Sequence, residues 1–248
     1  MPENSWDQVS VCVITLNEEA NLPRCLASVV PCGEIVVVDS GSTDRTREIA
    51  ETYGAKWFVR NWAGFAKQRQ FAEQQCTRDF VLFLDADEWL SDDLHREIGE
   101  LLAANDAGTR MYALRRRSEF LGRQIRHGDW KNDWVTRLAP RGQTEWRGAE
   151  PHPYLASSSL TRRPCGSPLF HRPFRDLEQF RAKNEVYAAL FAAPRGNRMT
   201  AISHSIWRFV RGYIFRAGFL DGAPGFILAR EYSRMVHLKY AGSSSRIA

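Results

Sequence analysis

Residues 81–88 read VLFLDADE, and this short stretch decides the fold. Four consecutive apolar residues are typical of a strand buried in a parallel sheet, and three acidic residues follow within the next four positions. In open α/β sheets, ligands bind beyond the carboxyl ends of the strands. The stretch therefore predicts an α/β sheet with a ligand site at the edge where this strand ends.

The same pattern of strand and helix repeats on both sides of this stretch. Short apolar runs alternate with segments of helical spacing throughout residues 1–117. The expected strands are 9–15, 35–38, 56–59, 80–84 and 111–115, and the expected helices are 19–29, 43–53, 65–75 and 91–103. This alternation predicts a doubly wound α/β fold, in which helices flank a mainly parallel sheet.

The two aspartates of the stretch have the spacing of a metal site. Asp85 and Asp87 are two positions apart, so both side chains project to the same side of an extended chain. Carboxylates so close repel one another unless a cation lies beside them. Mg²⁺ and Mn²⁺ suit this position, because they combine one or two carboxylates with substrate phosphates. The alternative is that the acids only cap the next helix, which is the role expected for Asp92 and Asp93.

Three further segments place polar groups at the same edge. In residues 36–44, VVVDSGSTD, Asp39 ends a strand and can accept from a ribose or a base, while Asp44 either joins the site or caps the following helix. Residues 15–19, TLNEE, end the first strand. Residues 64–69, GFAKQR, supply cations that can meet phosphate.

The composition is that of an ordinary globular protein, but its charge is divided unevenly. Apolar residues make up 44% of the 248 and charged residues 25%, so disorder is not expected. Residues 1–150 carry 19 Lys and Arg against 24 Asp and Glu, whereas residues 151–248 carry 15 against 5. The basic part suggests nucleic acid, an anionic membrane surface or a phosphorylated substrate as partner.

Cysteine spacing and hydropathy limit the location of the chain. The five widely spaced cysteines form no C-x-x-C pair, so neither a disulfide framework nor a zinc site is expected. Free cysteines of this kind indicate a reducing compartment. The first residues have no signal-peptide pattern, and the chain has no run of 18 apolar residues.

The C-terminal part is predicted to form helices over residues 176–193, 199–218 and 226–240. Within residues 206–216, helical spacing places one set of apolar residues on one arc and arginines on the opposite arc. The apolar set is Ile206, Phe209, Val210, Tyr213 and Ile214, and the arginines are Arg208, Arg211 and Arg216. This arrangement suits the headgroup boundary of a membrane, and the alternative is a helix packed on the domain with a solvated basic face. The arginines at 115–117 either meet acceptor phosphates or are solvated.

Taken together, these segments resemble the family 2 glycosyltransferases of GT-A fold. Within that family the chain is similar to the lipopolysaccharide-core type that adds glucose to an inner-core heptose. The matching segments are TLNEEANLPRCLASV, EIVVVDSGSTDRT, WAGFAKQRQFA, FLDADE, LGRQIRHGDW and GFLDGAPGFILA. VVVDSGSTD together with LDADE is specific for the family, and the last two segments point to the lipopolysaccharide-core branch.

The resemblance implies an inverting transfer of a hexose, with UDP-glucose as the expected donor. It implies that the D-x-D motif formed by Asp85 and Asp87 binds Mg²⁺ or Mn²⁺ and the diphosphate. The implied donor-binding residues are Thr15, Asn17, Glu18, Asp39, Asp44, Arg69 and Asp85. Inversion further implies a carboxylate base that takes the proton of the acceptor hydroxyl.

The position of that base is where this sequence departs from the branch. The pattern there is G-x-x-V-H-E, and residues 148–153 read GAEPHP, so His152 is kept and Pro153 stands in the place of the glutamate. Asp133 and Glu150 are equally favoured as the base, and Asp129 is a further candidate. A third possibility is that the usual glutamate is only structural.

The expected organisation has three regions, 1–117 for the nucleotide sugar, 118–175 for the acceptor and catalysis, and 176–248 as a helical membrane-associating extension. We expect a cytoplasmic protein, peripheral on the inner face of the membrane, with a lipid-linked saccharide as acceptor. Alternatives are a polyprenyl-phosphate acceptor, a capsule or exopolysaccharide acceptor, or a non-catalytic nucleotide-sugar-binding relative. Nucleic acid is not an expected partner, because the N-terminal half is acidic and no helix-turn-helix or zinc pattern occurs.

Overall fold

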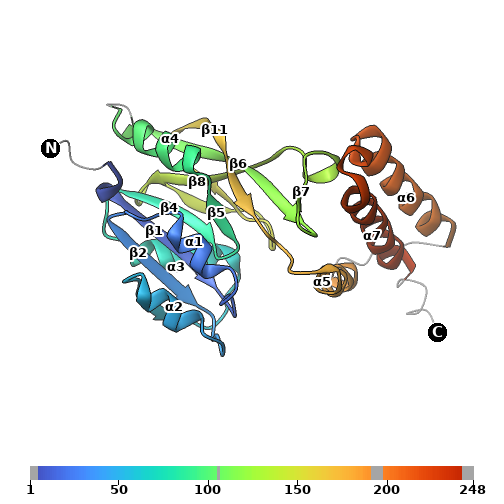
Figure 1. Cartoon of the computed structure of the whole chain (residues 1–248), viewed down its shortest axis with the longest axis horizontal. Helices are drawn as coiled ribbons and strands as arrows, with labels where there is room; N and C mark the ends of the chain where they lie inside the picture. Colours follow the sequence, from blue (N-terminus) through green and yellow to red (C-terminus); the bar gives the residue numbers. More distant parts are fainter. Residues whose placement is uncertain (1–4, 105–106, 191–197, 242–248) are drawn as a thin grey trace. The chain divides into compact units, whose positions relative to one another are not determined.

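The computed structural model describes residues 5–104, 107–190 and 198–241. The chain forms two compact units (Figure 1). Unit 1 consists of residues 1–116 and 134–171, and unit 2 consists of residues 117–133 and 172–248. Residues 117–133 therefore interrupt unit 1 in the sequence.

Unit 1 is built on a mixed sheet. Its parallel half contains, in spatial order, β3 (Lys56–Val59), β2 (Glu34–Asp39), β1 (Val9–Thr15) and β4 (Phe80–Asp85). The sheet continues through β8 (Asp133–Pro140), β6 (Arg110–Phe120), β11 (Thr161–His171) and β5 (Glu88–Leu90). β8 is antiparallel to β4, and β11 is antiparallel to β5. The predicted α/β fold is confirmed, and its sheet also contains antiparallel pairs.

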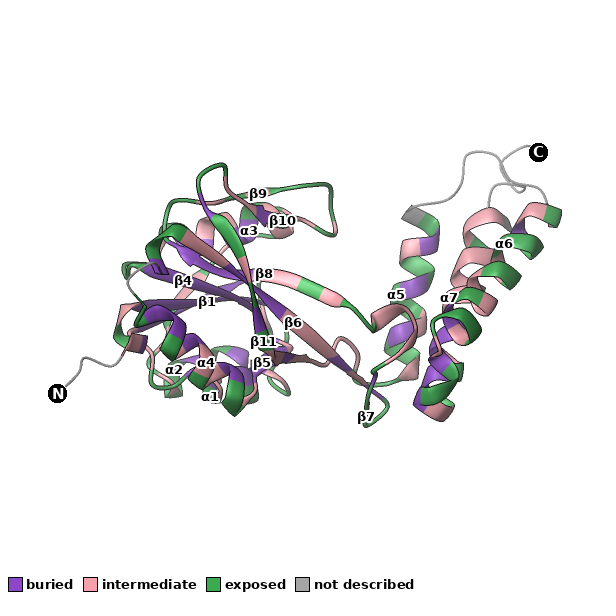
Figure 2. Ribbon diagram, turned by 90° about the horizontal axis from the view of Figure 1, so that it is seen from above, coloured by how far each residue is buried: buried purple, intermediate pink, exposed green. Residues whose placement is uncertain are grey.

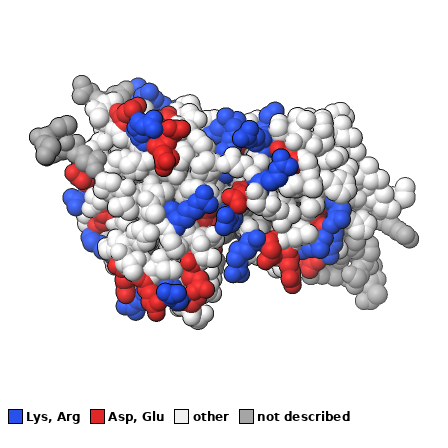
Figure 3. Space-filling model, in the orientation of Figure 1, with Lys and Arg blue, Asp and Glu red and all other residues white. Residues whose placement is uncertain are grey.

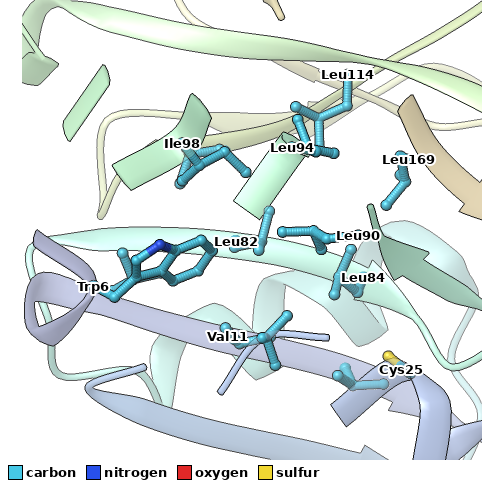
Figure 4. Close-up of a cluster of buried hydrophobic side chains, with 14 of the residues drawn as sticks. Trp6, Val11, Cys25, Leu82, Leu84, Leu90, Leu94, Ile98, Leu114 and Leu169 are labelled. Carbon is cyan, nitrogen blue, oxygen red and sulfur yellow. The ribbon is translucent and has the colours of Figure 1, made fainter. Parts of the chain in front are cut away.

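Helices cover both faces of the parallel strands, because each strand is apolar on both sides. Val11 and Val13 of β1 belong to one buried cluster, and Cys12 and Ile14 belong to another. The first cluster lies under α1 (Leu22–Ala27), α2 (Thr46–Thr52) and α4 (Asp92–Leu102), and Figure 4 shows part of it. The second lies under α3 (Phe65–Gln74) and the hairpin of β9 (Glu145–Arg147) and β10 (Tyr154–Ala156). Figure 2 shows the strands between these helices as mostly buried.

Unit 1 differs in two places from what the sequence predicts. The first helix begins at Leu22 rather than at Glu19, since Asn17 has a positive φ of 54° and Pro23 suits a first turn. A further long strand, β11, which the pattern of the sequence does not predict, occupies Thr161–His171. It lies between β6 and β5, and its last three residues pair with β5, about 80 residues earlier in the sequence, so no local pattern predicts the strand.

Unit 2 is mainly helical. It contains α5 (Leu177–Leu190), α6 (Arg198–Val210), a π-helical segment (Arg211–Phe215), a 3₁₀ turn (Gly218–Asp221) and α7 (Gly222–Ala241). The strand β7 (Arg123–Gln124) pairs with the end of β6, and a short 3₁₀ turn (Gly128–Trp130) follows it. A core of its own holds the unit together, with Phe120, Ile125, Phe180 and Leu228 at its centre. No helix in the described ranges is both long and apolar enough to span a membrane.

The predicted division of residues 206–216 into an apolar and a basic arc is wrong in part. Phe209 and Tyr213 pack internally against Phe226, with ring centroids 5.9 and 5.6 Å away. Arg208 and Arg216 pair with Asp129, although the side chain of Arg216 remains exposed. The cause is the π-helical segment, in which the amide of Arg216 donates to the carbonyl of Arg211 and the extra residue shifts the phase of the helix.

Candidate active site

The acidic and polar residues predicted from the sequence meet at one edge of unit 1, where three parallel strands end. Thr15 of β1 is paired in register with Asp39 of β2, and Ile14 is paired with Asp85 of β4. Parallel pairing forces the carboxyl ends of these strands together. The three strand-end segments that the sequence analysis grouped into one candidate site therefore lie side by side in the structure.

The loops after β1 and β2 are joined by hydrogen bonds. The amide of Asn17 donates to Ser42 Oγ at 2.7 Å, and Asn17 Oδ1 accepts from the amide of Thr43 at 2.8 Å. The amide of Glu18 donates to Thr46 Oγ1 at 2.9 Å. These bonds fix the two loops as one rim of the site.

Asp39 is buried at the base of this rim. Its Oδ2 accepts from the amides of Gly41 and Ser42 at 2.8 and 2.7 Å, and its Oδ1 accepts from the Ser42 hydroxyl. Gly41 has a φ of 105°, a conformation that glycine adopts without strain. Asp39 therefore shapes the turn directly, whatever else it contacts.

Asp44 belongs to the same rim, in the turn that precedes α2. Its Oδ1 accepts from the amide and hydroxyl of Thr46, at the start of α2, and its Oδ2 accepts from the amide of Glu19 at 3.2 Å. Burial would raise the pKa of Asp44, but the bonds from Thr46 outweigh this effect and lower it. In the structure Asp44 therefore stabilises the turn before α2, whose N-cap position is Arg45 and has no side-chain capping bond.

The hydroxyl of Thr15 has a different environment. It is buried at the end of β1, and no described residue forms a hydrogen bond with it. Buried hydroxyl groups are normally paired with protein, water or ligand. Thr15 therefore offers a hydrogen-bonding group at the predicted donor site.

Asp85 is held between two guanidinium groups. Its Oδ1 accepts from Arg69 Nη2 at 2.5 Å, and its Oδ2 accepts from Arg137 Nη2 at 2.8 Å. Burial would raise the pKa of Asp85, but the charges of Arg137 and Arg69 outweigh it and hold the pKa far below its usual range. Asp85 is therefore ionised at any physiological pH.

Three members of this network were missed by the sequence analysis. Glu88 is fully buried, and its Oε1 accepts from Arg137 at 2.8 Å and from Arg116 at 3.1 Å. Its Oε2 accepts from the amide of Asp85 at 3.1 Å. Arg137 belongs to β8 and Arg116 to β6. In the sequence, Arg137 is only an isolated charge in an apolar strand, and Arg116 is only one member of a basic run. The resulting cluster has three guanidinium groups around two carboxylates.

Asp87 points to another strand. Its Oδ2 lies 3.5 Å from Nε2 of His171, at the end of β11. Within the described ranges, no group of three or more His, Cys, Asp and Glu side chains is arranged to hold a metal. A magnesium or manganese ion shared with a substrate diphosphate needs only one or two protein ligands. Asp87 and His171 fit such an ion, whereas both oxygens of Asp85 already accept from arginines.

Two of the candidate bases, Glu150 and Asp129, have partners outside this cluster. Glu150 accepts from the amide of Ala66, at the start of α3, at 3.2 Å. His152 is exposed. Asp133 is the first residue of β8 and the last residue of the segment 117–133, which belongs to unit 2. Asp129 accepts from Arg208 and Arg216 at 2.6 and 2.7 Å, so this candidate is engaged in holding unit 2 together.

Comparison with known proteins agrees with the resemblance expected from the sequence. Lipopolysaccharide core biosynthesis glycosyltransferase LpsC of Rhizobium meliloti is 46% identical over 103 residues, which make up 40% of this chain and 38% of that protein. An uncharacterized glycosyltransferase of Rickettsia typhi is 45% identical over 100 residues, 40% of this chain and 34% of that protein. The matches thus cover less than two fifths of the length of these relatives.

A solved structure has the same fold. Staphylococcus aureus TarS, residues 1–349, in complex with UDP-GlcNAc gives a TM-score of 0.51 at 16% identity, over 96% of this chain and 91% of that one. The family model for "Glycosyl transferase family 2" matches residues 10–164. Because that match covers more than half of the chain and includes all three strand ends of the site, this protein belongs to glycosyl transferase family 2.

Proposed function

We propose that this chain transfers a hexose, in the simplest case glucose, from a UDP-sugar to a lipid-linked saccharide such as the lipopolysaccharide inner core, with inversion. The observation that carries this proposal is the cluster at the end of β4, where Asp85 fixes Arg69 and Arg137 next to Asp87. The similarity to LpsC, whose name gives lipopolysaccharide core biosynthesis, supports the acceptor class. The fold shared with a UDP-GlcNAc complex is compatible with the donor class.

In this proposal the nucleotide lies over the rim formed by the loops after β1 and β2. Thr15 offers its buried hydroxyl, and Asn17 and Glu18 offer polar groups on the same rim. Asp39 and Asp44 act mainly by holding the two turns in shape. The diphosphate then lies toward Arg69, whose side chain is fixed by Asp85.

The chemistry requires that negative charge be neutralised as the bond between sugar and diphosphate breaks. Arg69 and Arg137 provide fixed positive charge at the strand ends, and preorganised charge of this kind lowers the barrier. Mg²⁺ or Mn²⁺ is the proposed cofactor, with Asp87 and His171 as the residues that would hold it. When bound, the ion would stabilise the departing diphosphate.

The acceptor hydroxyl attacks the anomeric carbon directly, and a base takes its proton while the nucleoside diphosphate leaves. Asp133 and Glu150 remain the proposed bases, with His152 near the second in sequence. Glu150→Gln keeps an oxygen that accepts from the amide of Ala66 and removes the negative charge. A large loss of turnover at unchanged stability in Glu150→Gln or in Asp133→Asn identifies the base, and unchanged turnover in both rejects these assignments.

Unit 2 is the proposed membrane contact. The proposed location is the cytoplasm, with the protein bound peripherally to the inner face of the membrane. Several large apolar side chains of α6 and the segments after it are exposed. They are Met199, Ile202, Ile206, Trp207, Ile214, Phe215, Phe219, Leu220 and Phe226. Exposed apolar surface next to arginines suits an anionic bilayer. Figure 3 shows large uncharged areas over these helices with basic side chains beside them.

Donor binding is the decisive test. We would titrate the purified protein with a panel of nucleotide sugars, first with Mn²⁺ or Mg²⁺ and then with a chelator. Metal-dependent binding of one UDP-sugar is expected, and Asp87→Asn should lose it while Asp92→Asn, on the exposed first turn of α4, should keep it. Absence of binding to every nucleotide sugar would refute the proposal. Transfer to lipopolysaccharide core, polyprenyl phosphate or capsule saccharide then identifies the acceptor.

A further inference from the structure

Two sequence segments that the donor site does not use come together inside unit 2. They are residues 121–130, LGRQIRHGDW, and residues 218–229, GFLDGAPGFILA. His127 from the first segment and Asp221 from the second are 94 positions apart. The distance between His127 Nδ1 and Asp221 Oδ1 is 2.9 Å.

Asp221 is built to hold this imidazole in one orientation. It is buried, and its carboxylate also accepts from the amides of Arg126 and His127, at 3.2 and 2.8 Å. An ionised carboxylate only accepts hydrogen bonds, so Nδ1 of the ring must carry the proton that it donates. In the neutral ring, Nε2 is then an acceptor. Among the residues that the structure describes, none forms a hydrogen bond with Nε2 of His127.

The ring lines a small pocket that belongs entirely to unit 2. Its walls include Gly128, Trp130, Gly212 and Tyr232. The indole nitrogen of Trp130 donates to the Tyr232 hydroxyl at 2.9 Å, so the indole is fixed in place and its polar atom is already used. The pocket wall also needs glycine where two backbones approach, since a Cβ on Gly218 would lie only 2.7 Å from the carbonyl oxygen of Gly212.

The size of the pocket limits what can enter. Its volume is about 10 Å³, which is close to the space that one water molecule or one hydroxyl group needs. An acceptor nitrogen is suited to a hydroxyl that donates a hydrogen bond, and a saccharide can place one such group in a space of this size. The chemistry therefore favours a sugar hydroxyl over an anion, which would need a donor at this position.

We propose that His127 accepts a hydrogen bond from one hydroxyl of the acceptor saccharide, and that Asp221 is the positioning residue that orients it. This inference rests on the proposed function, because it assigns part of the acceptor's recognition to unit 2. It makes residues 121–130 and 218–229 a specificity-determining site for the saccharide.

The test uses the full-length protein and the delipidated inner-core oligosaccharide as probe. His127→Asn keeps a side-chain donor near the position of Nδ1, so the bond to Asp221 that joins the two segments can still form. It removes Nε2, the atom proposed to bind the saccharide, so the variant tests saccharide binding alone. Loss of one hydrogen bond to a neutral ligand should weaken oligosaccharide binding by about tenfold. Donor affinity and melting temperature should stay unchanged, and the ¹⁵N NMR signal of Nε2 in the unaltered protein should shift on titration.

Two controls make the result specific. His204→Asn changes an exposed histidine of α6 outside the pocket and should leave oligosaccharide binding unchanged. Asp221→Asn should weaken binding as His127→Asn does, because the ring loses its orientation. Equal binding by His127→Asn and the unaltered protein, or no binding and no Nε2 shift at all, overturns the inference. Transfer from a UDP-sugar, measured on the same samples, decides the proposed function separately.

Discussion

Asp85 illustrates how a motif residue can be recognised from sequence while its environment cannot. The strand pattern placed it at a sheet edge, but the bond to Arg137 comes from a strand 52 positions later. Arg137 also contacts Glu88, so one guanidinium group joins two carboxylates that would otherwise repel each other. Burial would lower the pKa of Arg137, but Asp85 and Glu88 outweigh this effect and raise the pKa above its usual value.

Replacing Arg137 should therefore affect both stability and activity. Arg137→Ala leaves two buried carboxylates without a shared partner, and we expect the free energy of unfolding to fall by about 3 kcal/mol. Donor binding should weaken as well, because Asp85 would then be held by Arg69 alone. Arg96→Ala removes an exposed arginine that pairs with Asp93 and should cost less than about 1 kcal/mol. Urea denaturation of both variants tests this, and equal losses would contradict it.

Glu34 lies at the start of β2, at the opposite end of the strand from Asp39, and it is expected to make the stability of the protein depend on pH. Burial would raise the pKa of Glu34, but hydrogen bonds from Lys56, Ser10 and Thr77 outweigh it and lower the pKa to about 2. A depressed folded-state pKa stabilises the protein above the unfolded value of 4.5, and that stability is lost as the pH falls toward 2. The contribution is on the order of 3 kcal/mol.

The measurement compares the unfolding free energy of the unaltered protein with that of Glu34→Gln across this range. The difference between them should be largest above pH 4.5 and should shrink as the pH falls below it. A difference that does not change with pH would show that the charge of Glu34 has no part in its stabilising effect.

The residues of the strand ends could be predicted from sequence, and those of the antiparallel strands could not. Thr15, Asp39 and Asp85 each follow a continuous apolar run, which gives a local signal. Glu88 was read as part of an acidic stretch, and Arg137 and His171 lie in strands with irregular burial. Their roles arise from pairing between distant segments, and a single sequence does not record that pairing.

At the level of elements, α6 and the π-helical segment after it form the surface on which a membrane prediction rests. Trp207 and Phe215 have ring centroids 5.8 Å apart, and their side chains are exposed. Replacing both by serine should lower binding to anionic vesicles at least tenfold, because apolar area no longer enters the bilayer. Tyr154→Ser, on an exposed strand of unit 1, is the matched control. Vesicle sedimentation tests this, and equal binding by both variants would reject the assigned surface.

The helices of unit 2 could be located from periodicity, but the outward face of residues 206–216 could not. Regular 100° spacing assumes one hydrogen-bonding pattern throughout, and the π-helical segment breaks that assumption at Arg211. The half-buried Asp129 also pairs with Arg208 and Arg216, and no helical projection includes these ion pairs. Sequence periodicity therefore predicted the presence of the helix and misjudged which side is free.

At the level of the whole molecule, charge separates the two units. Unit 1 carries 17 Lys and Arg against 21 Asp and Glu, whereas unit 2 carries 17 against 8. Raising the ionic strength from about 0.1 to about 1 M shortens the Debye length from about 10 to about 3 Å. Vesicle binding should then weaken, and only the apolar contribution should persist. Binding that is unaffected by salt on anionic vesicles would argue against an electrostatic role for unit 2.

The division of unit 1 in the sequence has a consequence for how the protein is made. During synthesis from the N-terminus, β4 and its acidic end leave the ribosome well before Arg137 on β8 and His171 on β11. A nascent chain that ends at residue 116 has an unpaired edge on β4 and a cluster of acids that lacks its later counter-charges. Truncated or stalled chains of this kind are expected to aggregate through that open strand, and the donor site becomes complete only after β11 has been made.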